Sequence, residues 1–237
     1  MSHSTASADH PSESRYNFYY IIHKGLRLGH CRLLAMISAT DFTDATAAAK
    51  TISAVRDFLV LARAHLEGEN REIHTALEAR APGASAHAAD DHEDHERSFD
   101  ELEILLRAIE TAPQATRDEA GRTLYHRYAL FAADDYEHMN AEETGLLQAL
   151  HETFTDQELL DIEHRIVAAI PPAKMAAYLM LMMPALSHGE RVGMLSKMRQ
   201  GMAAAVFEGI VENAVKPSLE PAAFAAVASA LSLRKAA

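Results

Sequence analysis

The chain has 237 residues, of which 49% are hydrophobic, so it is long enough for one large domain or for one domain with an appendage. Its formal net charge of -12 argues against nucleic acid and against an anionic membrane surface as a partner. The single cysteine, Cys31, excludes an internal disulfide and fits a reducing, cytoplasmic location, and no apolar run approaches the roughly 18 residues of a membrane span.

A polar tail precedes the first predicted helix. Residues 1–15 have no apolar stretch of the kind found in secretory signals, and their composition is typical of disordered chain. We therefore expect a disordered N-terminal tail over residues 1–15 and ordered structure from residue 16.

Four long helical segments are predicted after the tail. Gly and Pro are scarce, at 10 and 8 residues, whereas Ala, Leu and Glu are abundant, and this composition favours helix. Breaks in the helical pattern fall at "ATDFTDA", "RAPGAS" and "TAPQAT", where turn and capping residues gather. The predicted helices cover about residues 16–38, 45–80, 85–111 and 116–151. Long helices joined by short links are typical of an all-α, up-down-up-down four-helix bundle, here over residues 16–152.

The remainder of the chain predicts shorter helices. "TDQE", at 155–158, has the pattern of a capping box, and "SHGE" at 187–190 has the same pattern. The methionine-rich stretch "MAAYLMLMMPAL" is typical of a buried helix, although methionine also suits an adaptable partner surface. We expect residues 153–237 to form a C-terminal helical extension packed on the bundle.

The placement of histidine on the long helices is the most informative feature of the sequence. The chain has 14 histidines, and projection at about 3.6 residues per turn puts several of them on apolar stripes. The second and fourth helices carry the same His-x-x-x-Glu pair, "HLEGE" at 65–69 and "HMNAE" at 138–142. Residues four apart lie on one helix face, so each pair can reach one centre. The stripes hold His23 and His30 on the first helix, His65 and Glu69 on the second, His92 and His95 on the third, and Asp135, His138 and Glu142 on the fourth.

Carboxylates and imidazoles on buried faces indicate a metal site. A buried charge is costly unless it is paired or bound to a metal, and two buried carboxylates that face each other repel. Four histidines and two glutamates can surround two metals, with the glutamates bridging between them. Imidazole and carboxylate without thiolate suit iron, manganese or zinc, and two bridging carboxylates favour a non-heme di-iron centre. Open ligand positions would admit water, dioxygen, peroxide or nitric oxide.

Three stretches within residues 16–152 resemble a known family, the hemerythrin-like HHE cation-binding proteins. The segments "IHKGLR", "AHLEGENREIHTALEARAPG" and "EHMNAEETGLLQAL" are similar to the motifs of its helices 1, 2 and 4. The resemblance implies ligand roles for His23, His65, Glu69, His138 and Glu142. In the oxygen-carrying hemerythrins the fourth-helix arrangement ends in an aspartate, whereas this chain has His-x-x-x-Glu, which argues against reversible oxygen carriage.

The third helix offers two candidate ligands, His92 and His95. The register from Leu102 and the spacing from Glu69 favour His92, and His95 then either orients a ligand or replaces His92. Two tyrosines on the stripes, Tyr19 and Tyr128, are expected to pack in the core, with a donor role at the site as the alternative.

Several further residues have two interpretations. His30 lies about two turns beyond His23, so we expect it to be a core or supporting residue rather than a ligand. Asp135 lies one turn before His138, and it either accepts the free N–H of His138 or lies at an exposed rim. Cys31 is predicted to be a buried, inert thiol. The remaining histidines predicted at the surface are His74, His87, His126, His151 and His164.

The sequence leaves the class of activity open. One hypothesis is a protein that binds or senses dioxygen, nitric oxide or iron itself, and a second is a di-iron enzyme that acts on peroxide or nitric oxide. A third is a zinc-stabilised structural module. The sequence has no Gly-rich phosphate loop, G-x-S-x-G, paired C-x-x-C or His-Glu-x-x-His, which argues against the enzyme classes that use them. It identifies no protein partner and no organic substrate.

Overall fold

The computed structural model describes residues 15–233, and within this range the protein is all-helical, without strands. The predicted all-α class is therefore confirmed for the described residues. All of the predicted tail except Arg15 lies outside them. Arg15 donates a hydrogen bond of 2.7 Å to the carbonyl of Phe154 and pairs with Asp156, so it ties the start of the described chain to its middle.

The first two long helices form a hairpin that continues through a π-helical turn. We call the elements α1 (Tyr19–Ala39), α2 (Ala45–Gly68), η1 (Glu69–His74) and α3 (Thr75–Arg80) the first hairpin. The side chain of Asn17 accepts the backbone N–H groups of Tyr19 and Tyr20, so α1 begins at Tyr19 and not at the predicted residue 16. Asp44 caps α2 by accepting the N–H groups of Thr46 and Ala47.

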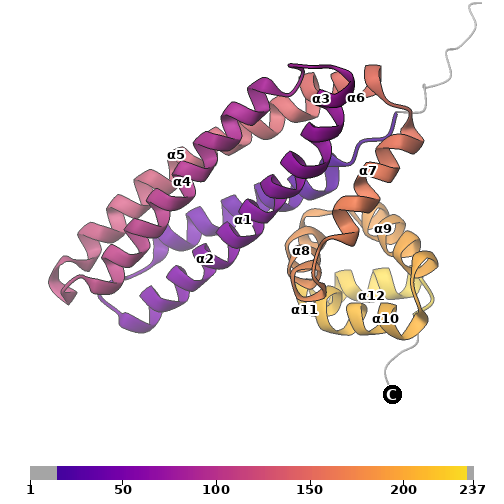
Figure 1. Ribbon diagram of the computed structural model, residues 1–237. Helices are drawn as coiled ribbons and strands as arrows, with labels where there is room; N and C mark the ends of the chain where they lie inside the picture. The colour runs from indigo at the N-terminus through magenta and orange to yellow at the C-terminus, as the bar shows by residue number, and fades with distance from the viewer. Residues whose placement is uncertain (1–14, 234–237) are drawn as a thin grey trace, which may run out of the picture.

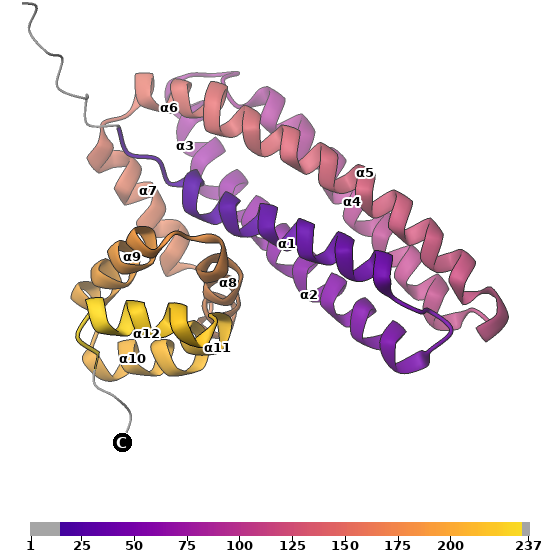
Figure 2. The ribbon, with the colours of Figure 1, turned by 180° about the vertical axis from the view of Figure 1, so that it is seen from behind.

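The second hairpin has the same plan. It consists of α4 (Ala86–Thr111), the short 3-10 turn η2 (Gln114–Thr116), α5 (Arg117–Ala141), the π-helical turn η3 (Glu142–Leu146) and α6 (Leu147–Thr153). The long helices α1, α2, α4 and α5 lie side by side, with α1 against α2 and α5, and α4 against α2 and α5 (Figures 1 and 2). Apolar side chains fill the space between them, including Phe58, Leu102, Leu106, Leu124 and Phe131.

The two π-helical turns change which residues the helices bury. Each turn begins at the glutamate of a His-x-x-x-Glu pair. A π-helical turn contains an additional residue, because each N–H bonds to the carbonyl five residues back and not four. A regular helix would place Ala76 and Ala149 on the buried face, whereas the structure leaves them half-buried and buries Leu77 and Leu150, one residue later. The two hairpins therefore share a break in register as well as a motif.

The C-terminal elements are α7 (Asp156–Ala168), α8 (Pro172–Ala185), α9 (His188–Gly201), α10 (Ala204–Ile210), η4 (Val211–Val215), α11 (Lys216–Ser218) and α12 (Pro221–Ala230). From α8 onwards they form a second apolar cluster beside the first hairpin (Figure 2), whereas Leu159 and Ile162 of α7 pack in a separate cluster with residues of both hairpins. Both predicted capping boxes are confirmed, at Thr155 with Glu158 and at Ser187 with Glu190.

Helix α8 contains the methionine-rich stretch and packs against α1. A Cβ atom at Gly25 would lie 3.0 Å from Met182 Cγ, so the glycine permits this close approach. The hydroxyl of Tyr178 donates a hydrogen bond of 2.7 Å to the carbonyl of Leu61 in α2. One face of α8 is thus buried, as predicted. No single helix within residues 15–233 is both long and apolar enough to span a membrane, and α7 with α8 passes that test only as a pair bent by 116°.

Candidate metal centre

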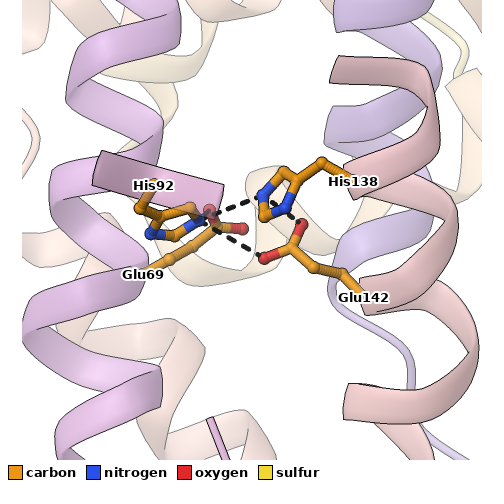
Figure 3. A group of neighbouring side chains, drawn as sticks. All are labelled: Glu69, His92, His138 and Glu142. Carbon is orange, nitrogen blue, oxygen red and sulfur yellow. Dashed lines mark hydrogen bonds and ion pairs between the residues drawn. The ribbon is translucent and has the colours of Figure 1, made fainter. Parts of the chain in front are cut away.

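The six predicted ligand residues meet between the four long helices. Five are buried, and His65 is half-buried, with 16% of its side chain exposed. They come from α1 (His23), α2 (His65), η1 (Glu69), α4 (His92), α5 (His138) and η3 (Glu142). Figure 3 shows Glu69 and His92 facing His138 and Glu142 across the space between the helices.

The donor atoms fall into two groups that share one carboxylate. In the first, called the His92 group, the donor atoms of Glu69, His92, His138 and Glu142 lie within 4.8 Å of one another. In the second, called the His23 group, those of His23, His65 and Glu69 do so. Because Glu69 belongs to both groups, its two oxygens can serve two neighbouring cations.

The distances show how each carboxylate lies between imidazoles. Glu69 Oε1 is 3.1 Å from His65 Nε2, and Glu69 Oε2 is 3.7 Å from His92 Nε2. Glu142 Oε2 lies 3.3 Å from His23 Nε2 and 3.5 Å from His138 Nε2. The Nε2 atoms of His92 and His138 are 3.0 Å apart. With His23 Nε2 also 3.9 Å from Glu69 Oε1 and His92 Nε2 3.7 Å from Glu142 Oε1, each glutamate lies near three imidazoles, at least one from each hairpin.

Buried polar atoms without partners gather at this site. Among the described residues, the buried side-chain nitrogen and oxygen atoms that lack a hydrogen-bond partner are Tyr19 Oη, His23 Nε2, His65 Nε2, Glu69 Oε1, both ring nitrogens of His74, and Glu142 Oε1 and Oε2. A buried polar group without a partner costs roughly 1–3 kcal/mol. Five of these atoms belong to the two donor groups, and a cation would satisfy them. The residues present therefore fit a metal bound by nitrogen and oxygen.

The pKa values of Glu69 and His23 are shifted because carboxylates and imidazoles lie close together in this buried site. Burial alone raises the pKa of Glu69, but the imidazoles of His65, His23 and His92 lower it below its usual value. Burial alone lowers the pKa of His23, but its interactions with Glu143, Glu69 and Glu142 raise it to about 9. The carboxylate of Glu69 thus stays ionised, and the imidazole of His23 is favoured in its protonated form.

The other ring nitrogens of three of the histidines bind acceptors outside the two groups. Nδ1 of His23 lies 2.9 Å from Glu143 Oε1, which also accepts a hydrogen bond from Arg27. His92 Nδ1 lies 2.8 Å from Asn70 Oδ1, and His138 Nδ1 lies 3.2 Å from Asp91 Oδ2. An N–H donated from Nδ1 leaves the lone pair of Nε2 directed into the site, as metal-binding histidines require.

Asp135 pairs with His30 and not with His138, the partner that the sequence suggests. It was a candidate acceptor for the free N–H of His138, but Asp91 takes that place. Asp135 Oδ2 instead lies 2.7 Å from Nε2 of His30, a fully buried histidine outside both donor groups. Burial raises the pKa of Asp135, but the hydrogen bond from His30 lowers it below its usual value, so Asp135 is ionised.

His92 and His95 occupy different places. His92 lies in the first donor group, whereas His95 lies outside both groups and has its Nδ1 atom 3.8 Å from Asp135 Oδ1. The ring of His95 contacts that of His138, with centroids 4.8 Å apart. His95 therefore lies beside the donor groups, between His138 and Asp135.

Two predictions about which residues are buried are wrong, those for His74 and Cys31. His74 was predicted at the surface, but it is only 6% exposed, because the π-helical turn η1 rotates it towards the core. Cys31 was predicted to be buried, but it is exposed, with Sγ 3.3 Å from Tyr136 Oη. Among the other histidines assigned to the surface, His151 is half-buried, and the exposed ones are His87, His126 and His164.

The two stripe tyrosines are both buried, but they contact different histidines of α1, Tyr19 contacting His23 and Tyr128 of α5 contacting His30. Tyr19 lies next to His23, with ring centroids 5.1 Å apart, and its hydroxyl has no partner. The hydroxyl of Tyr128 lies 3.1 Å from His30 Nδ1, so this residue belongs to the network of Asp135 and not to the donor groups.

A small cavity lies among the donor residues themselves. Its volume is about 10 Å³, and its polar lining comprises His65, Glu69, His92, His138 and Glu142 of the donor groups together with His95 and Asp135. A cavity of this size holds about one water molecule. The enclosed space among the donors is therefore too small for an organic molecule.

Comparisons with known protein families, with curated proteins and with solved structures found no match. Within the described chain, the buried His/Glu cluster, a group of side chains that could hold a metal ion, is the feature that indicates a function.

Proposed function

We propose that this chain is a hemerythrin-like metal-binding protein whose long helices form an up-down-up-down four-helix bundle around a non-heme di-iron site. The observation that carries the proposal is the pair of buried donor groups that share Glu69. The resemblance of "HLEGE" and "HMNAE" to the motifs of that family supports the same conclusion.

In this proposal each half of the donor set holds one metal. His23 and His65 serve one position, His92 and His138 serve the other, and Glu69 and Glu142 lie between them. Four imidazoles and two carboxylates without thiolate favour iron over zinc or manganese. When bound, two irons would supply a redox-active pair with coordination positions for a small ligand.

The small enclosed space among the donor residues, about 10 Å³, supports a small species and not an organic substrate. We therefore assign the protein to the binding or sensing of dioxygen, nitric oxide or iron itself. A reducing, cytoplasmic location is part of this proposal, because it would keep the exposed thiol of Cys31 reduced.

A di-iron enzyme that acts on peroxide or nitric oxide is the second candidate. The observation that favours it is the polar lining of the cavity, where the carboxylate of Asp135 and the imidazole of His95 lie beside the donor groups. Such side chains can hold a proton next to a small ligand. Binding alone would not require them.

The decisive experiment is elemental analysis of protein purified from iron-replete cells. We expect about two irons per chain, and a strong reduction in the variants Glu69→Ala and Glu142→Ala. Zinc alone at full occupancy would favour a structural module. A chain that holds no metal, even after anaerobic reconstitution with ferrous iron, would contradict the proposal.

Peroxide turnover then separates the two candidates. An enzyme loses turnover in Glu69→Ala and Glu142→Ala relative to the iron-loaded wild type. Equal rates in all three proteins would exclude the peroxide enzyme and leave binding or sensing.

A further inference from the structure

His74 is the one histidine beside the donor groups with no partner for either ring nitrogen. It is more than nine-tenths buried, and neither Nδ1 nor Nε2 has a hydrogen-bond partner. A neutral imidazole has one N–H donor and one acceptor lone pair, so both of its polar functions are unsatisfied. A buried histidine of this kind calls for a partner that the side chains around it do not supply.

His74 packs against only one of the two donor groups. Its ring stacks on that of His92, with centroids 4.8 Å apart and planes inclined by 18°. The rings of His92 and His138, whose Nε2 atoms face each other, have the same centroid separation of 4.8 Å. The donor atoms of His74 belong to neither group, but its ring packs against a member of the His92 group and not of the His23 group.

The π-helical turn η1 is the reason that His74 reaches this place. Glu69 is the first residue of the turn and His74 is the last, five positions later. Residues five apart lie on the same face of a π-helical turn, whereas in a regular helix they do not. The turn that begins at the shared carboxylate thus brings a further imidazole to the same face.

The second hairpin has no equivalent of this histidine. The residue five positions after Glu142 is Leu147, which is also buried but has no donor atom. At this position the first hairpin therefore has the imidazole of His74, whereas the second has the apolar side chain of Leu147.

We propose that His74 is a fifth imidazole donor, which serves the metal position of the His92 group and makes that position different from the one of the His23 group. This inference rests on the proposed metal site. His95 is the other imidazole next to the same group, but its Nδ1 atom faces Asp135 and its ring nitrogens are not among the unpartnered atoms. His74 is therefore the better donor.

The test compares metal binding in wild type, His74→Leu and a matched packing variant, Ile73→Val. Ile73 lies in the same π-helical turn and is as deeply buried, but it has no donor atom. Metal-free protein is titrated with Co²⁺, and protein loaded with ⁵⁷Fe is measured by Mössbauer spectroscopy. We expect His74→Leu to weaken one of the two positions by at least about 10–100-fold, the loss typical of altered metal surroundings, and to change the signal of one iron only. Ile73→Val should behave like wild type.

Stability provides a second readout that a packing role would not produce. Metal-free His74→Leu should resist denaturant better than wild type, because two unsatisfied buried nitrogens are removed. The same variant should gain less stability from metal than wild type gains. If His74→Leu does not fold, His74→Gln provides the metal-binding comparison, because an amide nitrogen cannot replace an imidazole as a donor. It is not used for the stability comparison, because its amide is itself polar.

The outcomes separate this inference from the proposed function. A wild-type chain that takes up no metal would overturn both. A wild type with two metals and a His74→Leu variant with the same affinities and the same iron signals would overturn the role of His74 alone, and would indicate that buried water satisfies the ring.

Discussion

The two hairpins bring the same donors to the metal centre but surround them differently. Each supplies a histidine from its first helix, a His-x-x-x-Glu pair from its second, and a π-helical turn that begins at the glutamate. The residue after each glutamate binds the first-helix histidine of the opposite hairpin, Asn70 to His92 and Glu143 to His23. The donors are thus repeated, whereas the acceptors behind them differ in charge.

Two further positions show the same difference. Asp91, which precedes His92, binds Nδ1 of His138, but the residue that precedes His23 is the apolar Ile22. His74 follows Glu69 by five residues, where the second hairpin has Leu147. A repeated backbone plan therefore fixes where the ligands lie, and their sequence neighbours decide how alike the two metal positions are.

The largest expected effect comes from the carboxylate that both groups share. Glu69→Ala should abolish tight binding at both positions, whereas His65→Ala should weaken only the His23 group. Metals per chain, measured after dialysis against a weak chelator, would fall from about two to near zero in the first variant and to about one in the second. The exposed neighbour Glu67, changed to Ala, is the matched control and should leave the content unchanged. Equal losses in the Glu69 and His65 variants would contradict the division into two groups.

The pH dependence of metal-free protein tests the charge behind His23. Burial lowers the pKa of His23, but Glu143, Glu69 and Glu142 outweigh burial and raise the pKa from 6.5 to about 9. This raised pKa stabilises the folded protein, and the stabilisation is complete when the pH is below the pKa of the unfolded chain, about 6.5. It is lost as the pH rises through about 9. The loss is at most about 3 kcal/mol.

Denaturation in the presence of a chelator at pH 6 and pH 9 measures this loss. The variant Glu143→Gln should reduce the difference between the two pH values. A wild-type stability that does not change over this range would show that His23 is not held in its charged form.

A smaller effect is expected from the acceptor that only the second hairpin has. Asp91→Asn removes the charge behind His138 and should weaken metal binding by about 10–100-fold at the His92 group. Ile22→Val, the matching position of the first hairpin, should leave the affinity unchanged. Calorimetric titration with Zn²⁺ measures both, and a similar loss in the two variants would show that the acceptor is unimportant.

The smallest effect concerns a residue outside both hairpins. Thr155→Ala removes the capping box of α7 and should lower the free energy of unfolding by about 1 kcal/mol. The metal content should not change, because the C-terminal helices supply no residue to either donor group. A loss of metal in this variant would show that the extension helps to hold the site together.

The regular parts of the helices explain what could be predicted from the sequence. The spacing of His65 to Glu69 and of His138 to Glu142 follows the period of a normal helix, so the shared faces could be identified from the sequence alone. The capping boxes could be recognised because they depend only on residues close together in the chain. Cys31 was misplaced because it lies about 100° around the helix from His30, so the burial of one says little about the other.

The burial of His74 and the contacts between helices could not be predicted, because they depend on a change of register and on how closely the helices pack. His74 was missed because the register changes at Glu69, and a count of about 3.6 residues per turn fails beyond that point. Asn70 and Asp91 were missed because each acts across the space between two helices, and their reach depends on how closely those helices pack. The contact of α8 with α1 at Gly25 was unpredictable for the same reason.

The π-helical turns also have a consequence for how this chain is aligned with others. Each contains one residue more than a regular turn, so deletion of a single residue there would restore a normal helix without rotating the residues that follow. Gly145 is such a residue, since it is exposed and a side chain added to it would meet nothing. Gaps of one residue are therefore to be expected directly after the glutamates, inside helices, where alignment methods normally penalise them most.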